Sequence, residues 1–362
     1  MAEAPSSRVL PYERVRSYLL EAAPRDVYHA LPKHVADALE IPQRIALEAL
    51  VGLMFDGAAK MHWELECPFC NAFAEIGDVF QTAITDTTCG ACGADFTVHV
   101  DHEAQVTFSP HPNIRDLDEA ADDPDYRAQV RQQYGPTTVH ELMTIQRFRD
   151  WAQNEPLAPD EHLEVSQMTI WFSDLTGSTA LYARNGDPFA YQLVREHFGL
   201  VGEAVQGAEG AIVKTMGDGV MGVFSHTVDA VDASLRVNRM LREFNEAKGL
   251  DDDRCLRLKI GIHTGPAIVV TLNNRLDYFG TTVNTASRVS NLARGEEIVL
   301  TEASYAQPEV PARLMGYRIR EFASQVRGLD DPIMAYRVEL YPREVQHRSG
   351  LLGFLDRLGR SK

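Results

Sequence analysis

The sequence is poor in cysteine, has no long apolar run and lacks an excess of positive charge. Its five cysteines are an odd number in 362 residues, which argues against a disulfide-bonded scaffold of the secreted kind. The longest apolar stretches, such as residues 45–55, are interrupted by charge and fall short of the roughly 20 residues that cross a bilayer. The first residues show neither the basic start nor the apolar core of a secretory signal. We therefore expect a cytoplasmic protein without a membrane span.

The charge balance is strongly acidic. There are 35 Lys and Arg residues against 52 Asp and Glu residues, which gives a formal net charge of −17. Such a surface repels phosphate backbones unless a local basic patch overrides it, so no nucleic-acid partner is expected. Hydrophobic residues at 44% and charged residues at 24% are typical of globular proteins, and 362 residues exceed what one hydrophobic core usually holds. We expect two or three folded domains.

Hydrophobic periodicity divides the chain into four parts. We expect residues 1–110 to form a helical, winged-helix-like unit with a small β module. Residues 111–160 begin as an acidic linker and continue as a connector helix over 139–151, which has apolar residues on one face. Residues 161–340 form the largest domain, and residues 341–362 form an amphipathic tail.

Strands and helices alternate in the largest domain. The predicted strands are 168–173, 211–216, 220–224, 256–263, 267–271, 297–300, 317–322 and 333–338. The predicted helices are 188–208, 228–247 and 283–293. The order βαββαβ predicts an α+β fold of the ferredoxin-like kind, with its helices packed on one face of the sheet.

Four of the five cysteines form two pairs, Cys67 with Cys70 and Cys89 with Cys92. Each pair has a two-residue spacer and 18 residues separate the pairs, which fits the spacing of a tetrahedral zinc site. The alternative, two disulfides, is disfavoured in a reducing cytosol. Four thiolates leave no open position for water, so we predict a structural Zn²⁺ in a zinc ribbon.

Two carboxylates stand at places suited to metal binding. Asp174 ends an apolar strand before a glycine turn, and Asp218 lies in a tight turn between two strands. If these strands are neighbours in one sheet, the carboxylates converge at one edge, as two Mg²⁺ ions require. Taken singly, each residue fits equally well as a turn or helix-capping aspartate.

Four segments follow one another in a recognisable order: Phe172-x-Asp174-Leu175-x-Gly177-Ser178-Thr179, Lys214-Thr215-Met216-Gly217-Asp218, Gly261-Ile262-His263-x-Gly265 and Asp277-Tyr278-Phe279-Gly280-x-x-Val283-Asn284-x-Ala286-x-Arg288. They resemble the successive signatures of class III nucleotidyl cyclases over about half of the chain. The stretch around Trp63-Glu64-Leu65-Glu66-Cys67 is similar to a poorly characterised domain that precedes some bacterial cyclases.

The resemblance implies that residues 161–340 are a cyclase catalytic domain that converts ATP to 3′,5′-cyclic AMP and pyrophosphate. It implies that Asp174 and Asp218 hold two Mg²⁺ or Mn²⁺ ions per active site, and that the Leu175 carbonyl completes the shell. It also implies a homodimer in which each site takes residues from both subunits.

The remaining site residues follow from the same resemblance. Asn284 is expected to orient the ribose and Arg288 to neutralise charge on the α-phosphate, since both lie on one helical face. Without the flanking motifs, Asn284 would be interpreted as a helix-capping residue and Arg288 as a surface residue. Lys214 as a donor and Asp277 as an acceptor suit N1 and N6 of adenine, whereas guanine presents the reverse pattern.

One position departs from the family pattern. Cyclases of this type often carry Lys where this chain has Arg327, next to the β- and γ-phosphates, and a planar guanidinium does not replace a point charge in full. We therefore expect a changed rate rather than a changed reaction.

The C-terminal tail carries an apolar stripe beside basic residues. The apolar residues are Leu351, Leu352, Phe354, Leu355 and Leu358, and the basic ones are Arg357, Arg360 and Lys362. Packing on the protein or on a partner subunit is the favoured interpretation, with weak contact to a membrane surface as the other.

Two alternatives to an adenylate cyclase stay open. The cyclase-like half could be a catalytically weak nucleotide sensor joined to a zinc-ribbon module that binds nucleic acid or protein. The enzyme could also use another nucleotide, such as GTP. A sensor would not need both Asp174 and Asp218, and the acidic net charge disfavours DNA.

Overall fold

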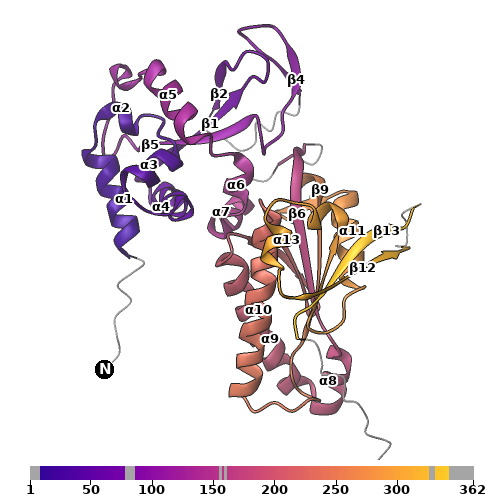
Figure 1. Cartoon of the computed structure of the whole chain (residues 1–362). Helices are drawn as coiled ribbons and strands as arrows, with labels where there is room; N and C mark the ends of the chain where they lie inside the picture. The colour runs from indigo at the N-terminus through magenta and orange to yellow at the C-terminus, as the bar shows by residue number, and fades with distance from the viewer. Residues whose placement is uncertain (1–8, 78–85, 155–156, 159–160, 326–330, 342–362) are drawn as a thin grey trace, which may run out of the picture.

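The structure is a computed structural model, and it describes residues 9–77, 86–154, 157–158, 161–325 and 331–341. The chain forms an N-terminal part and a C-terminal part that meet at the helices α6 and α7 (Figure 1). Within the described ranges, no helix is long and apolar enough to cross a membrane. The apolar stripe and basic residues predicted in the tail, residues 351–362, lie outside the described residues.

Four helices open the N-terminal part: α1 (Val9–Glu21), α2 (Pro24–Val27), α3 (Pro32–Ala38) and α4 (Gln43–Phe55). The strands that follow are β1 (Ala59–Glu66), β2 (Phe73–Gly77), β3 (Asp86–Thr88), β4 (Asp95–Thr97) and β5 (Ala104–Pro110). Strand β1 is central in the antiparallel sheet β2-β1-β5, and β3 pairs only with β4. Every residue of β5 is buried, although β5 is an edge strand. The helical segment covers part of this edge, since Phe108 exchanges two backbone hydrogen bonds with Ala30.

The predicted connector helix over 139–151 is two helices in the structure. Helix α6 (Val139–Met143) begins with a capping box between Thr138 and Glu141, and α7 (Gln146–Trp151) starts after a break at Thr144 and Ile145. The preceding acidic segment contains the short 3-10 helix η1 (Glu119–Ala121) and leads into α5 (Pro124–Tyr134). The 3-10 helix η2 (Ala152–Asn154) follows α7.

The C-terminal part contains one eight-stranded sheet. Its strands are β6 (Leu163–Leu175), β7 (Ala211–Met216), β8 (Gly219–Phe224), β9 (Leu258–Leu272), β10 (Arg275–Phe279), β11 (Glu297–Thr301), β12 (Arg318–Ser324) and β13 (Ile333–Glu339). Its helices are α8 (Ser178–Asn185), α9 (Asp187–Gln206), α10 (Thr227–Ala247), α11 (Thr281–Ser290), α12 (Glu302–Tyr305) and α13 (Val310–Arg313).

The sheet order is β12-β13-β11-β9-β6-β8-β7, and β10 pairs with β9 as a branch off this path. The predicted α+β fold with βαββαβ order is confirmed. Two predicted strands over 256–263 and 267–271 are a single strand, β9, and β10 was not predicted. Strand β9 continues through Pro266 because β6 pairs with it on both sides of that residue, with a register shift at Val165 to Met168.

Helices cover both faces of this sheet, so the prediction of helices on one face was wrong. Helices α9 and α10 pack on the face that contains Trp171, Ile260 and Ile262, and form one buried cluster with it. Helix α11 packs on the opposite face, where a Cβ on Gly261 would lie 2.2 Å from the backbone nitrogen of Ser290. Only glycine at this position lets the helix approach β9 so closely.

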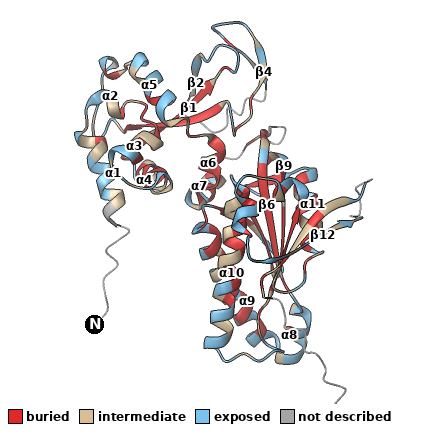
Figure 2. Ribbon diagram, viewed as in Figure 1, coloured by how far each residue is buried: buried red, intermediate tan, exposed pale blue. Residues whose placement is uncertain are grey.

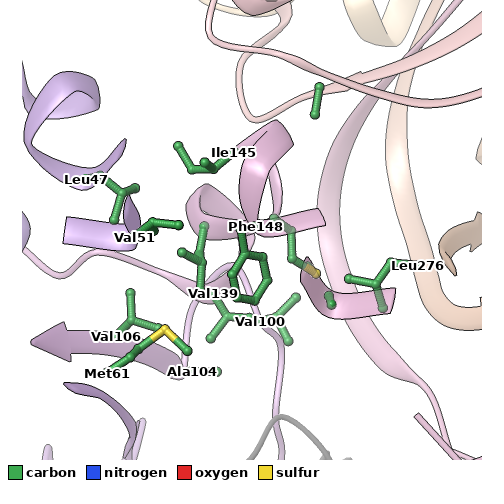
Figure 3. Close-up of a cluster of buried hydrophobic side chains, with 14 of the residues drawn as sticks. Leu47, Val51, Met61, Val100, Ala104, Val106, Val139, Ile145, Phe148 and Leu276 are labelled. Atoms are coloured by element: carbon green, nitrogen blue, oxygen red, sulfur yellow. The ribbon is translucent and has the colours of Figure 1, made fainter. Parts of the chain in front are cut away.

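The second face of the sheet shares its core with the N-terminal part. Phe148 of α7 is fully buried, and the cluster around it includes Leu47 and Val51 of α4 on one side and Leu276 of β10 on the other (Figure 3). Figure 2 shows buried residues running through α6 and α7 between the two parts. Helix α7 is therefore packed between the N-terminal helices and the C-terminal sheet.

Candidate functional site

The two predicted metal carboxylates lie at one end of the central strands. Strand β6 pairs with β8 so that Ser173 lies opposite Val220, and an added Cβ on Gly219 would be 3.4 Å from Oδ1 of Asp174. Burial lowers the pKa of the His197 imidazole, and the charges of Asp218 and Asp174 both act on it in the opposite direction. Both carboxylates are thus close to the same buried side chain.

Asp218 lies in the two-residue turn between β7 and β8. Met216 pairs with Gly219, so the central residues of the turn are Gly217 and Asp218, whereas an Asp-Gly hairpin motif would place Asp218 and Gly219 there. Gly217 has φ +63°, the conformation that the first central residue of a type II′ hairpin turn needs. The turn thereby presents the Asp218 carboxylate beside the end of β6.

The chemistry of this acidic pair fits a hard divalent cation. Oδ2 of Asp218 is buried and has no hydrogen-bond partner among the described residues. An unpaired buried carboxylate oxygen is costly unless a cation or donor satisfies it. Leu175 ends β6 directly after Asp174, so its carbonyl is within one residue of the pair. Oxygen donors of this kind are those that Mg²⁺ and Mn²⁺ prefer.

Two groups beside the acidic pair were not identified from the sequence. Nζ of Lys259 in β9 lies 2.7 Å from Oδ2 of Asp174, as their opposite positions in the β6–β9 pairing require. Helix α8 starts at Ser178 after Gly177, and no side chain caps its first N–H groups. A helix N-terminus with open N–H groups favours anions, so this segment is suited to phosphate oxygens. The position of Lys259 beside Asp174 can be seen only from the strand register. In the sequence, a lysine that alternates with apolar residues is common in exposed strands and does not by itself indicate a site.

Lys214 and Asp277, the two residues predicted to contact the base, lie next to each other. Nζ of Lys214 lies 2.5 Å from Oδ2 of Asp277, whose other oxygen accepts a hydrogen bond from the Tyr278 backbone nitrogen at 2.8 Å. Asp277 is 6% exposed, while Lys214 is partly exposed beside the Phe279 ring. The pair therefore offers one donor and one acceptor at the edge of the sheet.

Asn284 and Arg288 lie on α11 and are held in place by the glycines of β9. Close contact at Gly261 fixes the end of the helix, and Thr282 Oγ1 lies 2.9 Å from where a Cβ on Gly265 would be. Asn284 is exposed and Arg288 partly exposed, and neither makes an ion pair or a side-chain hydrogen bond within the described residues. Both side chains are thus available to a ligand. Arg327, the third predicted catalytic residue, lies outside the described residues.

The strand register places Asp174 of the acidic pair and Asp277 of the base-contacting pair near opposite ends of β9. Asp174 is opposite Lys259, the second residue of β9, whereas Asp277 is opposite Val270 near its end. At about 3.3 Å per residue the path between these positions is on the order of 35 Å along the strand. The structure thus brings Asp174 together with Asp218 and Lys214 together with Asp277, but it leaves the acidic pair and Asp277 separated within one chain.

The four paired cysteines converge in the N-terminal part. The sulfur atoms of Cys67, Cys70, Cys89 and Cys92 all lie within 4.8 Å of one another, and none is in a disulfide. Sγ of Cys67 is 3.8 Å from Sγ of Cys92, and Sγ of Cys70 is 3.6 Å from Sγ of Cys89. Four sulfurs placed tetrahedrally at ~2.3 Å from Zn²⁺ are about 3.8 Å apart, so the geometry fits zinc.

The backbone around the cysteines also favours a thiolate. Backbone N–H groups of Cys92 and Ala91 donate toward Sγ of Cys89 and lower the pKa of that thiol to about 6. Two similar turns carry the pairs, since Asn71 N donates to Cys67 O and Gly93 N donates to Cys89 O. Metal binding needs deprotonated sulfur, and these N–H groups lower the cost of deprotonation.

Comparison with known families now gives the class of the C-terminal part. Residues 161–336 match the family described as the adenylate and guanylate cyclase catalytic domain. Residues 31–145 match a family of unknown function (DUF5939). Residues 161–336 therefore belong to the class III nucleotidyl cyclases, as the motifs implied.

Two adenylate cyclases resemble this chain over about half of its length. The chain is similar to an adenylate cyclase of Anabaena cylindrica, with 27% identity over 218 residues, which is 54% of this chain and 43% of that protein. It is similar to an adenylate cyclase of Streptomyces griseus, with 28% identity over 51% of this chain and 47% of that protein. The chain thus spans less than half the length of these two relatives. Among solved structures, an adenylate cyclase of Trypanosoma brucei, described in its monomeric state, is 25% identical with a TM-score of 0.43, covering 53% of this chain and 96% of that one.

We predict that Cys89→Ser releases one equivalent of zinc and destabilises the N-terminal part, because three thiolates and a hydroxyl hold the ion less tightly than four thiolates. Elemental analysis of freshly purified, reduced protein, together with thermal unfolding, measures both effects. Cys255→Ser is the matched control, since the Cys255 thiol lies outside the cluster and donates only to the Asp252 carbonyl. Wild-type protein without zinc would contradict this assignment.

Proposed function

We propose that this protein is an adenylate cyclase that converts ATP to 3′,5′-cyclic AMP and pyrophosphate at the interface of a homodimer. The observation that carries the proposal is the convergence of Asp174 and Asp218, with a buried and unpaired Asp218 oxygen, in a domain of the class III nucleotidyl cyclases. A structural Zn²⁺ on the four cysteines and a cytoplasmic location, where thiols stay reduced, are parts of the same proposal.

In the proposed reaction the ribose O3′ attacks the α-phosphorus in line. A bond forms between O3′ and the α-phosphorus, the 3′-hydroxyl proton is released to water, the bond from the α-phosphorus to the bridging oxygen breaks, and pyrophosphate leaves with that electron pair. Two Mg²⁺ or Mn²⁺ ions held by Asp174, Asp218 and the Leu175 carbonyl would supply a lowered pKa for the 3′-hydroxyl and charge neutralisation on the triphosphate. The open N–H groups at the start of α8 bind phosphate oxygens beside them.

Asn284 and Arg288 orient and stabilise the reacting atoms in this proposal. The Asn284 amide holds the ribose so that O3′ faces the α-phosphorus. The Arg288 guanidinium, which has no ion pair within the described residues, donates to the α-phosphate as negative charge builds up in the transition state. Arg327 is proposed to contact the β- and γ-phosphates, with a rate altered by its planar guanidinium.

Base selection rests on the Lys214–Asp277 pair. Lys214 donates to adenine N1, and the Asp277 carboxylate accepts from the exocyclic amine at N6. Asp277 is held in place for this contact, because it is 6% exposed and one of its oxygens accepts a hydrogen bond from the Tyr278 backbone nitrogen. This supports ATP as the preferred substrate.

The separation of the acidic pair from Asp277 along β9 supports a homodimer. A second copy related by a two-fold axis can bring its Asp277 next to the first copy's Asp174, which creates two equivalent composite sites. Large apolar side chains are exposed on the strands that carry these residues, with Met216, Leu272 and Phe279 between 41% and 47% exposed. Such residues at the edge of the sheet favour coverage by a partner.

The test of the activity is direct. Purified full-length protein is incubated with ATP or with GTP, each with Mg²⁺ or Mn²⁺, and the products are identified by chromatography. Cyclic AMP and pyrophosphate in equal amounts support the proposal. Nucleotide binding without a cyclic product would favour the sensor alternative, and cyclic GMP as the main product would favour the other substrate.

We predict that Asp218→Asn lowers kcat by at least about 100-fold while the melting temperature stays within a few degrees, because a turn carboxylate adds little to the core. Asp252→Asn is the control, since the Asp252 side chain is 97% exposed and lies outside the site. Near-normal turnover of Asp218→Asn at saturating Mg²⁺ would show that the acidic pair does not bind catalytic metal.

We expect the double variant Lys214→Glu with Asp277→Cys to lose ATP turnover and to gain a relative preference for GTP, because the donor and acceptor pattern is reversed. The ratio of kcat/KM for ATP to that for GTP is the measurement, with circular dichroism as the check on folding. A wild-type enzyme that prefers GTP, or that does not distinguish the two nucleotides, would contradict the assignment of Lys214 and Asp277 to adenine.

Subunit mixing tests the composite site. Asp174→Ala and Arg288→Ala chains are each expected to be inactive, and random exchange makes half of the dimers mixed. Each mixed dimer keeps one intact site of two, so activity should return to about a quarter of the wild-type value. If exchange is demonstrated by a tag and no activity returns, the composite arrangement is wrong.

A further inference from the structure

Helix α7 contacts both strands that carry the proposed base-selecting pair. Oε1 of Gln146 accepts a hydrogen bond at 2.8 Å from the backbone nitrogen of Ile212 in β7. Arg149, one helical turn later, donates at 2.5 Å to the backbone oxygen of Leu276 and at 3.1 Å to the hydroxyl of Tyr278, both in β10. In the part of the chain that the structure describes, strands β7 and β10 each pair with a single strand, so α7 satisfies backbone groups at edges that would otherwise be open.

These contacts lie immediately beside the base-selecting pair. Ile212 precedes Lys214 by two residues, at a point where the pairing of β7 with β8 shifts register. Leu276 and Tyr278 flank Asp277 on both sides. Because backbone position fixes where a side chain starts, a shift of α7 changes the distance between Lys214 and Asp277.

An arginine such as Arg149 is unusual at a buried position with a purely structural role. It is 5% exposed and its guanidinium has no carboxylate partner within the described residues. Its contacts are the carbonyls of Leu276 and Met143, the Tyr278 hydroxyl and the Tyr278 ring, whose centroid is 5.2 Å from the guanidinium carbon. Burying an unpaired cation costs free energy that an apolar side chain would avoid, so the directed hydrogen bonds to β10 are what this residue adds.

The opposite side of α7 joins the N-terminal part. Phe148 is fully buried in the cluster that contains Leu47 and Val51 of α4, and Ile145 precedes α7 in the same cluster (Figure 3). Close-packed side chains transmit displacement because the interior has little free volume. A movement of the N-terminal helices therefore reaches β7 and β10 through one short helix.

We propose that Gln146 and Arg149 are positioning residues that set the geometry of the Lys214–Asp277 pair, and that α7 thereby couples the N-terminal part to binding of the nucleotide base. The inference rests on the proposed function, because it assigns base binding to Lys214 and Asp277. Neither positioning residue touches the substrate. Their effect is on base binding and discrimination, while the metal carboxylates lie at the other end of β9.

Four variants of the full-length protein test this proposal. Gln146→Leu removes the acceptor for Ile212, whereas Gln146→Glu keeps an acceptor oxygen in the same place. Arg149→Met keeps the chain length without the hydrogen bonds. Arg147→Met is the control, because Arg147 is exposed on the same helix and faces the Phe55 ring rather than β7 or β10.

For Gln146→Leu and Arg149→Met we expect KM for ATP to rise about 3- to 30-fold, with a smaller change in kcat and a reduced preference for ATP over GTP. Gln146→Glu and Arg147→Met should stay near wild type. Equilibrium binding of a non-cyclisable α,β-methylene ATP gives a second readout, and should weaken by the same factor. Thermal unfolding identifies a variant that has failed to fold. If Arg149→Met fails to fold, the comparison of Gln146→Leu with Gln146→Glu tests the proposal.

Three outcomes would overturn the inference: unchanged KM and nucleotide preference in a folded Gln146→Leu variant, an equal loss in Gln146→Leu and Gln146→Glu, or a fall in kcat alone. Failure of the proposed function is seen separately, since it appears as a wild-type protein that makes no cyclic AMP. Weaker analogue binding in Gln146→Leu but not in Gln146→Glu would support the positioning role even then.

Discussion

The antiparallel pairing of β6 with β9 is the constraint on which the rest of the site depends. It runs from Leu163 opposite Val269 to Leu175 opposite Leu258, so Asp174 lies one residue before the end of β6, while β9 continues toward the hairpin that carries Asp277. Glycine at position 261 of the same pairing admits α11, and with it Asn284 and Arg288. A shift of one residue would exchange the two faces of β9 and remove both the room for the helix and the contact between Lys259 and Asp174.

Motifs that consist of polar residues beside a turn were predictable from the sequence. Local chain geometry determines the position of Asp174 at the end of an apolar strand, of Asp218 in a hairpin turn and of each cysteine pair. The spacing of these residues in the sequence is therefore enough to predict where they lie. Lys214 and Asp277, by contrast, lie 63 residues apart and meet only through the folding of β9 and β10. The sequence predicted that both contact the base, but no periodicity in the sequence would have indicated their contact with each other.

The features that were missed depend on tertiary contacts. Strand β10 is short and has no partner except β9, so its five residues carry no strong pattern of their own. Helix α11 on the second face was not foreseen, because the close approach at Gly261 looks in the sequence like an ordinary strand glycine. The break between α6 and α7 follows from packing as well: Ile145 and Phe148 are both buried in the interface cluster, whereas Gln146 turns to β7. Ile145 itself is extended between the two helices, with φ −80° and ψ 113°.

The ion pair between Lys259 and Asp174 bears on how the proposed catalytic metal would bind. The ammonium group lies 2.7 Å from the carboxylate oxygen that a divalent cation would need. A cation at this oxygen would therefore compete with Lys259 for it. The negative charges of a triphosphate bound at the same edge would give Lys259 another partner. In the proposed reaction, metal binding at Asp174 would thus be coupled to nucleotide binding through one lysine side chain.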